Sequence, residues 1–193
     1  MMVHRIIKER ILPHLIMALV MIAFVPWAAG QKYYSKVGRI SFVSDAPLEK
    51  IEAVNNNAMI VVDATNGAVE CAVLIKGFQF AKALMQDHFN ENYMESHLFP
   101  KGLYKGTITN IRDINLSRDA AYTASLKGEL TLHGVTRPIV NTGQVVVKGG
   151  KISVATTFEV LVKDFEIEIP KVVRESVAEK VKVTVHSDLL LMQ

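Results

Sequence analysis

A two-residue alternation of apolar and polar side chains recurs along most of this chain, and it limits the fold more than any other feature. Between residues 122 and 133, alanine, leucine and glycine alternate with threonine, serine, lysine and glutamate. The same alternation returns at 151–160 and 181–186. Successive side chains of a β-strand point to opposite faces, so the pattern predicts strands with one apolar and one wet face. Antiparallel sheets have this character when only one side meets water.

Turn signals separate the alternating segments. Asn66-Gly67 and Gly149-Gly150 are typical of short hairpins between antiparallel strands. A long sheet whose neighbouring strands follow one another in sequence tends to close, because closure removes exposed edges. We therefore expect an all-β fold, an eight-stranded antiparallel up-and-down barrel. Its expected strands are 33–43, 50–62, 68–76, 101–114, 121–133, 139–148, 151–161 and 178–191.

The segment Phe78–Pro100 departs from this periodicity and is rich in aromatic, methionine and histidine residues. Its apolar residues recur at steps of three and four from 81 to 93, which places Leu84, Met85 and Phe89 on one stripe of a helix. This short helical insert lies between the third and fourth expected strands. Its stripe must be buried against the sheet or over the mouth of the barrel, where it would form the lid of a pocket.

The first thirty residues have the pattern of a secretory signal peptide. Basic side chains lead into an apolar run over 11–25, and small residues follow Trp27. The run is shorter than the roughly twenty residues that a spanning helix needs, and an uncleaved N-terminal anchor is the alternative. We expect a cleaved leader over 1–30, a periplasmic or secreted protein, and a single β-barrel domain over 31–193.

Charge and cysteine content narrow the classes of partner. The first thirty residues hold three of the 22 basic and one of the 19 acidic residues, so the remainder has a net charge of +1. Its basic residues are dispersed, whereas phosphate binding needs clustered positive charge, so we expect no nucleic-acid partner. Cys71 is the only cysteine, which excludes an internal disulfide. Its place in an alternating segment favours a small buried hydrophobe.

Two separated motifs carry a family resemblance. The first is LMQDHFNENYMES at 84–96, followed by FPKGLYKG at 99–106, and the second is GELTLHGVTRP at 128–138. In this order they resemble the YceI-like family, whose members are described as lipocalin-like polyisoprenoid-binding proteins, and the resemblance runs from about Val37 to the C-terminus. It implies a lipocalin-like barrel that carries an isoprenoid-type lipid, such as a polyisoprenoid or an isoprenoid quinone, without a cofactor.

The interior of an eight-stranded barrel is either packed solid or just wide enough for one small ligand. Small inward residues, among them Cys71, Gly106, Ala124 and Gly128, favour the second case. We then expect an apolar, elongated guest, with any polar head near the open end and in contact with His88. The predicted ligand-binding residues are Phe80, Leu84, Met85, His88, Phe89, Tyr93, Tyr104, Leu126, Leu130, Val154 and Phe158.

Other functions stay open at this point. A hydrolase or isomerase acting on lipids could use His88 or His97 as a base, and a ligand-free barrel could serve as a scaffold. We predict no catalytic residue and no enzyme, because neither a nucleophile elbow nor a Gly-rich phosphate loop is present. We predict no metal either, since a site needs at least three convergent ligands. A membrane that exchanges the ligand and a second copy in a homodimer remain open as partners.

Overall fold

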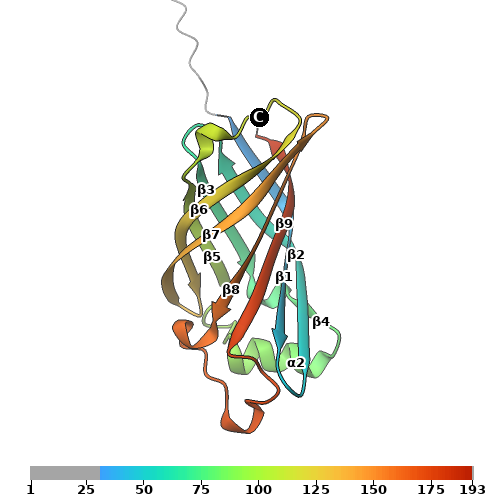
Figure 1. The fold of residues 1–193 in the computed structure, drawn as a ribbon. Helices are drawn as coiled ribbons and strands as arrows, with labels where there is room; N and C mark the ends of the chain where they lie inside the picture. The colour runs from blue at the N-terminus through green and yellow to red at the C-terminus, as the bar shows by residue number, and fades with distance from the viewer. Residues whose placement is uncertain (1–30, 193) are drawn as a thin grey trace, which may run out of the picture.

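The computed structural model describes residues 31–192, so the leader predicted over 1–30 lies outside the described residues. Eight long antiparallel strands form one closed sheet, which confirms the predicted barrel (Figure 1). The long strands are β1 (Lys32–Asp45), β2 (Lys50–Asp63), β3 (Ala68–Leu74), β5 (Lys101–Ile108), β6 (Ala120–Leu132), β7 (Val135–Lys148), β8 (Lys151–Leu161) and β9 (Lys180–Leu191). A two-residue strand, β4 (Gln79–Phe80), adds to β2, and the pairing of β1 with both β2 and β9 closes the barrel.

The expected strands match the observed ones closely, and the largest difference is at β5. This strand was expected to run to residue 114 but ends at Ile108. The side chain of Asn110 then takes over the bonding to β6: its Nδ2 donates to the Thr123 carbonyl over 2.9 Å, and its Oδ1 accepts from the Ser125 amide over 2.8 Å. An asparagine side chain that replaces the backbone in this way lets the chain leave the sheet.

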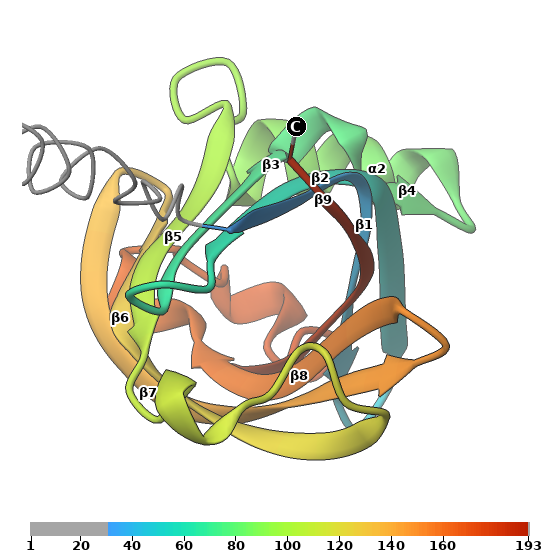
Figure 2. The same cartoon turned by 90° about the horizontal axis from the view of Figure 1, so that it is seen from above.

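The connections gather at two ends of the barrel. Residues 64–67, 109–119 and 149–150 lie at one end, next to Lys32 and Leu191, and we call this the terminal end (Figures 1 and 2). The opposite end, which we call the mouth end, carries residues 46–49, the insert 75–100, the turn 133–134 and the segment 162–179. Figure 1 shows α2 and the segment before β9 at this lower end.

The helical insert predicted over 81–93 is present. It consists of α2 (Ala83–His88) and a π-helical turn, η2 (Phe89–Tyr93). Both ends of the insert are pinned together, because the Ile75 amide donates to the Pro100 carbonyl over 2.9 Å. Four short 3-10 helices complete the elements: η1 (Ile75–Gly77), η3 (Ile111–Asp113), η4 (Val162–Phe165) and η5 (Lys171–Val173).

A tightly packed apolar cluster fills the terminal end. Ile114, Val147, Ile152 and Leu189 are buried there, and Ile111 and Leu116 pack against them. Three of these six residues come from the loop between β5 and β6, which therefore folds inward over the barrel. Burial of each large aliphatic side chain contributes about 1.5–3 kcal/mol, so this plug is a major source of stability.

The strands β7 and β8 part in the lower half of the barrel. Their pairing runs from Lys148↔Lys151 to Gly143↔Thr156, while β8 stays paired with β9 down to Leu161↔Lys180. Phe165 and Ile167, from the segment that follows β8, are buried beside the split and pack with Leu130 and Val160. Side chains from the segment after β8 therefore pack at the split.

Candidate functional site

A cavity of about 380 Å³ runs along the axis of the barrel. Its inner limit lies at Val62, Val69, Ile108 and Val145, which pack in the same core cluster as the plug residues. The deeper plug residues Ile114, Val147, Ile152 and Leu189 are not part of its wall. At the other extreme the wall reaches the mouth end through Ser44, Glu49, His88, Val173 and Ser176. The cavity is thus a blind tunnel that opens at the mouth end.

The strand alternation produces the apolar wall, since every second side chain of each strand points inward. Of the predicted ligand-binding residues, the following line the cavity: Phe80, Met85, His88, Phe89, Tyr93, Tyr104, Leu126, Leu130, Val154 and Phe158. Leu84 does not, and its side chain is 66% exposed. The predicted stripe assumed one regular helix over 81–93, whereas α2 begins at Ala83 and widens into a π turn at Phe89. That a ligand contacts these residues stays a prediction.

Four aromatic rings form a cluster in the wall near the mouth. Phe89 lies 5.4 Å from Phe42, 5.8 Å from Phe78 and 5.0 Å from Phe80 between ring centroids. All four line the cavity, and the cluster joins the insert to β1. Phe42 and Phe78 were missed as site residues. Phe42 could have been found from its alternation with Ile40 and Ser44, which also face inward.

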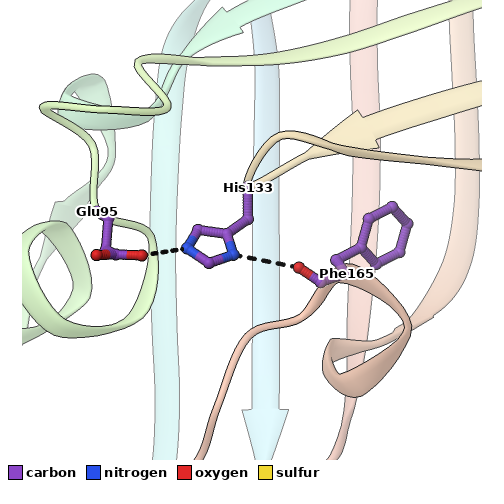
Figure 3. A network of polar contacts seen from close by, with 3 residues as sticks. All are labelled: Glu95, His133 and Phe165. Atoms are coloured by element: carbon purple, nitrogen blue, oxygen red, sulfur yellow. Dashed lines mark hydrogen bonds and ion pairs between the residues drawn. The ribbon is translucent and has the colours of Figure 1, made fainter.

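His133 connects three separate segments at the mouth end (Figure 3). Its Nε2 lies 2.8 Å from Glu95 Oε2 in the insert, and its Nδ1 lies 3.2 Å from the Phe165 carbonyl oxygen. His133 and Gly134 both have positive φ, 49° and 75°, and form a two-residue turn between β6 and β7, shorter than the link between the expected strands 121–133 and 139–148. Both facing atoms, a carboxylate oxygen and a carbonyl oxygen, are hydrogen-bond acceptors. The ring therefore holds the insert and the segment before β9 in place.

A second set of contacts closes the ring of loops on the other side of the mouth. Lys82 Nζ in the insert lies 2.9 Å from Glu49 Oε1 at the tip between β1 and β2. In the same tip, the Leu48 amide donates to the Glu175 carbonyl over 2.9 Å. Nearby, the Ala178 amide donates to Ser44 Oγ over 2.9 Å. The tip, the insert and the segment 162–179 thus surround the cavity entrance together.

The side chains of the cavity wall are suited to surround an apolar molecule. Burial raises the pKa of the Cys71 thiol to about 11, so this wall residue is a neutral thiol and a weak nucleophile at ordinary pH. Burial also raises the pKa values of the Tyr93 and Tyr104 hydroxyls, which stay protonated. The ionisable groups in the wall are otherwise confined to the mouth, at Glu49 and His88.

Other chemistry finds little support in the described part of the chain. Within 31–192, no group of three or more histidine, cysteine, aspartate or glutamate side chains is placed to hold a metal ion. His97, one of the two candidate bases, is exposed and does not line the cavity. Ser96 is buried close to Glu95, yet both nitrogens of His133 are already engaged and cannot activate it. No helix of residues 31–192 is both long and apolar enough to cross a membrane.

Comparisons with known proteins agree with this architecture. A family profile described as YceI-like domain matches residues 36–189. Among solved structures, a polyisoprenoid binding domain from Saccharophagus degradans superposes with a TM-score of 0.74 at 12% identity, covering 84% of this chain and 99% of that domain. BcnA of Burkholderia cenocepacia gives 0.64 at 14% identity over 79% and 96% of the chains. The YceI protein of Campylobacter jejuni gives 0.52 at 14% over 71% and 81%. No curated protein matches the sequence.

Proposed function

The chain belongs to the YceI-like family, and on that premise we propose that it binds a long apolar or amphiphilic lipid inside its barrel and carries it. The observation that carries the proposal is the blind apolar cavity that opens at the mouth end. A related fold, the domain from Saccharophagus degradans, is described as polyisoprenoid binding, which supports a lipid of isoprenoid type. The mechanism is sequestration of the hydrocarbon from water.

The shape of the cavity favours an elongated guest. Along β2 its wall extends from Ile51 to Val62. With about 3.3 Å per residue and a strand tilt of about 40°, this corresponds to roughly 25–30 Å along the axis. Burial of one methylene contributes roughly 0.8 kcal/mol, so two or three five-carbon units suffice for micromolar binding after the ordering costs.

The rim of the mouth suggests how the lipid is exchanged. Leu48, Leu84 and Val172 come from the three segments that surround the entrance and are 71%, 66% and 92% exposed. Lys171 directly precedes Val172, and Lys82, which pairs with Glu49, lies two residues before Leu84. Apolar tips flanked by cationic side chains fit the boundary between lipid headgroups and acyl chains. In this proposal the mouth touches a membrane, and a leader over 1–30 exports the protein to the periplasm or the outside.

The direct test measures binding of a fluorescent lipid probe to wall variants. Phe89→Ala and Leu126→Ala remove apolar area from the mouth and from the middle of the cavity, so each should weaken binding by roughly tenfold. Val140→Ala is the matched control, because Val140 is 75% exposed on β7 and does not line the cavity. Unchanged probe binding in both folded wall variants would rule out the barrel interior as the lipid site.

A lipid-acting enzyme is the alternative outcome. His88 lines the mouth, where the head group of a bound lipid would lie. A variant with both His88→Ala and His97→Ala should retain its ligand if the protein is a carrier, whereas an enzyme would lose turnover. Native mass spectrometry of freshly purified protein adds an independent readout, since a bound lipid appears as an additional mass.

A further inference from the structure

Strands β2 and β3 each contain an unbroken run of apolar residues, at 58–62 and 71–74, and the two strands pair directly through Met59↔Ala72. A strand with one wet face needs an apolar residue only at every second position. An unbroken apolar run is typical of a strand that is covered on both faces. The inward residues of these runs face the core and the cavity, but the outward Met59 and Leu74 are 50% and 57% exposed. The outer face of these strands is therefore apolar and uncovered.

The apolar outer surface extends onto β1 and reaches β9 (Figure 1). Tyr34 on β1 is paired with Val61 on one side and with Leu190 on the other. Val37 lies beside Met59, where the register of β1 with β2 shifts, and such a bulge re-aims a side chain. The Val37 side chain is 74% exposed. We call the outward apolar residues of β1, β2 and β3 the side patch: Tyr34, Val37, Met59, Val61, Ala72 and Leu74.

The opposite wall of the barrel has no comparable surface within the described residues. β7 lies four strands away from β2 in either direction around the closed sheet. On β5–β8, Val140 is the only large apolar side chain of residues 31–192 that is exposed. Its partner on β6 is Lys127, and the next outward residue on β7 is Thr142. An apolar outer wall is therefore not a requirement of the barrel itself.

The size and surroundings of the side patch match the centre of a protein–protein interface. Neighbouring strands lie about 4.8 Å apart and alternate residues about 6.6 Å apart, so the patch covers roughly 300–400 Å². A stable interface buries about 800 Å² on each partner, with an apolar centre and a polar rim. The rim carries both signs, with Glu70 and Asp188 against Lys36 and Lys105. A rim of mixed sign does not favour an anionic membrane surface, which attracts clustered basic residues.

We propose that the side patch binds the same patch on a second copy of this chain, which gives a two-fold symmetric dimer. A two-fold contact brings residues near the axis against their own copies, so a charge at the centre would meet itself. The central residues Val37, Met59 and Ala72 carry no charge, and charges of both signs lie outside them, where they can pair across the interface. No residue of the side patch lines the cavity, so this inference does not depend on lipid binding.

The test is analytical ultracentrifugation of the wild type and two variants over a wide range of concentration. The wild type should sediment as a dimer. Val37→Lys brings two like charges together across the interface, so the dissociation constant of the dimer should rise by roughly 100-fold. Val140→Lys is the matched control, because Val140 is 75% exposed on the opposite wall, and it should leave the dimer unchanged. Circular dichroism checks that both variants are folded.

A second measurement locates the contact on the surface. Labelling of Met59 and Leu74 by a photochemically generated carbene should decrease as the protein concentration rises, because the side patch becomes covered. Labelling of Val140 should stay constant. A wild-type protein that sediments as a monomer at every concentration would overturn the proposal. So would a dimer that Val37→Lys leaves intact, or one in which Met59 is labelled equally at all concentrations.

Discussion

The two ends of the barrel differ in how their apolar residues are used. At the terminal end, short turns and one inward-folded loop bury Ile114, Ile152 and Leu189 in a plug. At the mouth end, the tip between β1 and β2 and two long segments surround an opening and leave Leu48 and Val172 exposed to solvent. One end is closed by packing, and the other is held open by a small number of polar contacts.

Residues that stabilise the fold and residues that are proposed to bind the ligand therefore lie at different places along the barrel axis. Burial at the plug contributes directly to the free energy of unfolding. At the mouth, side-chain burial contributes less to the free energy of unfolding, because the wall faces the cavity. The loops there are joined mainly by contacts of Glu95, His133 and Glu49. Binding segments are typically drawn from the less stable parts of a fold. The comparison predicts that substitutions at the two ends have opposite consequences.

The largest effect on stability is expected from Ile152→Ala at the plug. Ile152 is 4% exposed and does not line the cavity, so the substitution should lower the free energy of unfolding by about 2–5 kcal/mol and leave probe affinity unchanged. Val154→Ala, two residues further along β8, removes a wall residue and should weaken probe binding with a smaller loss of stability. Urea denaturation and probe titration of both variants measure the two effects. Loss of probe binding in Ile152→Ala alone would contradict the separation.

The next largest effect is a pH-dependent change in the free energy of unfolding that arises from Cys71 in the cavity wall. The Cys71 thiol has a pKa near 9.0 when unfolded and about 11 in the folded protein, because burial disfavours the thiolate. Below pH 9 the thiol is protonated in both states and stability does not depend on it. Between pH 9 and 11 it ionises only in the unfolded chain, so the free energy of unfolding should fall by about 2 kcal/mol. Cys71→Ala should show a shallower decline, and equal slopes would mean that the thiol is not shielded.

Much of this architecture follows from local sequence patterns. The barrel could be predicted because a period of two reports which face of each strand is buried, and the turns carry their own glycine signals. The same alternation placed Leu126, Leu130, Val154 and Phe158 in the cavity wall. Leu84 was expected on the same stripe as Met85 and Phe89, yet within α2 it is Met85 and His88 that line the cavity, and Leu84 points to solvent.

The features that the sequence did not predict depend on contacts between distant segments. The pairing of His133 with Glu95 spans 38 residues, and no periodicity marks it. The loop 109–119 has no alternation to show that Ile111 and Ile114 fold into the barrel. Contacts between segments that are distant in sequence therefore decide which end of the barrel is plugged and which is open, although the same strands run through both ends.

A smaller effect is expected when the polar contact at the mouth is removed. Glu95→Ala leaves one nitrogen of His133 without its partner, and because the Glu95 side chain is 40% exposed we expect a loss of only about 1 kcal/mol. Hydrogen exchange should accelerate in the insert and in 162–167 while the plug keeps its protection. Glu159→Ala is the matched control, since its ion pair with Lys180 is exposed and should contribute less. Uniform acceleration over the whole barrel would show that the two ends are not independent.

The smallest effect on stability is expected at the rim. Leu84→Ser and Val172→Ser replace exposed side chains outside the cavity wall, so unfolding should change by less than about 0.5 kcal/mol and binding of a soluble probe should not change. Association with lipid vesicles should nevertheless weaken, because each variant removes an apolar side chain that would enter the headgroup region. Val140→Ser tests whether the effect is specific, since the exposure of Val140, 75%, lies between those of Leu84 and Val172 but the residue is on the side wall in β7. If all three variants bind vesicles as the wild type does, lipid exchange does not use this rim, and the open end serves only to admit the ligand from solution.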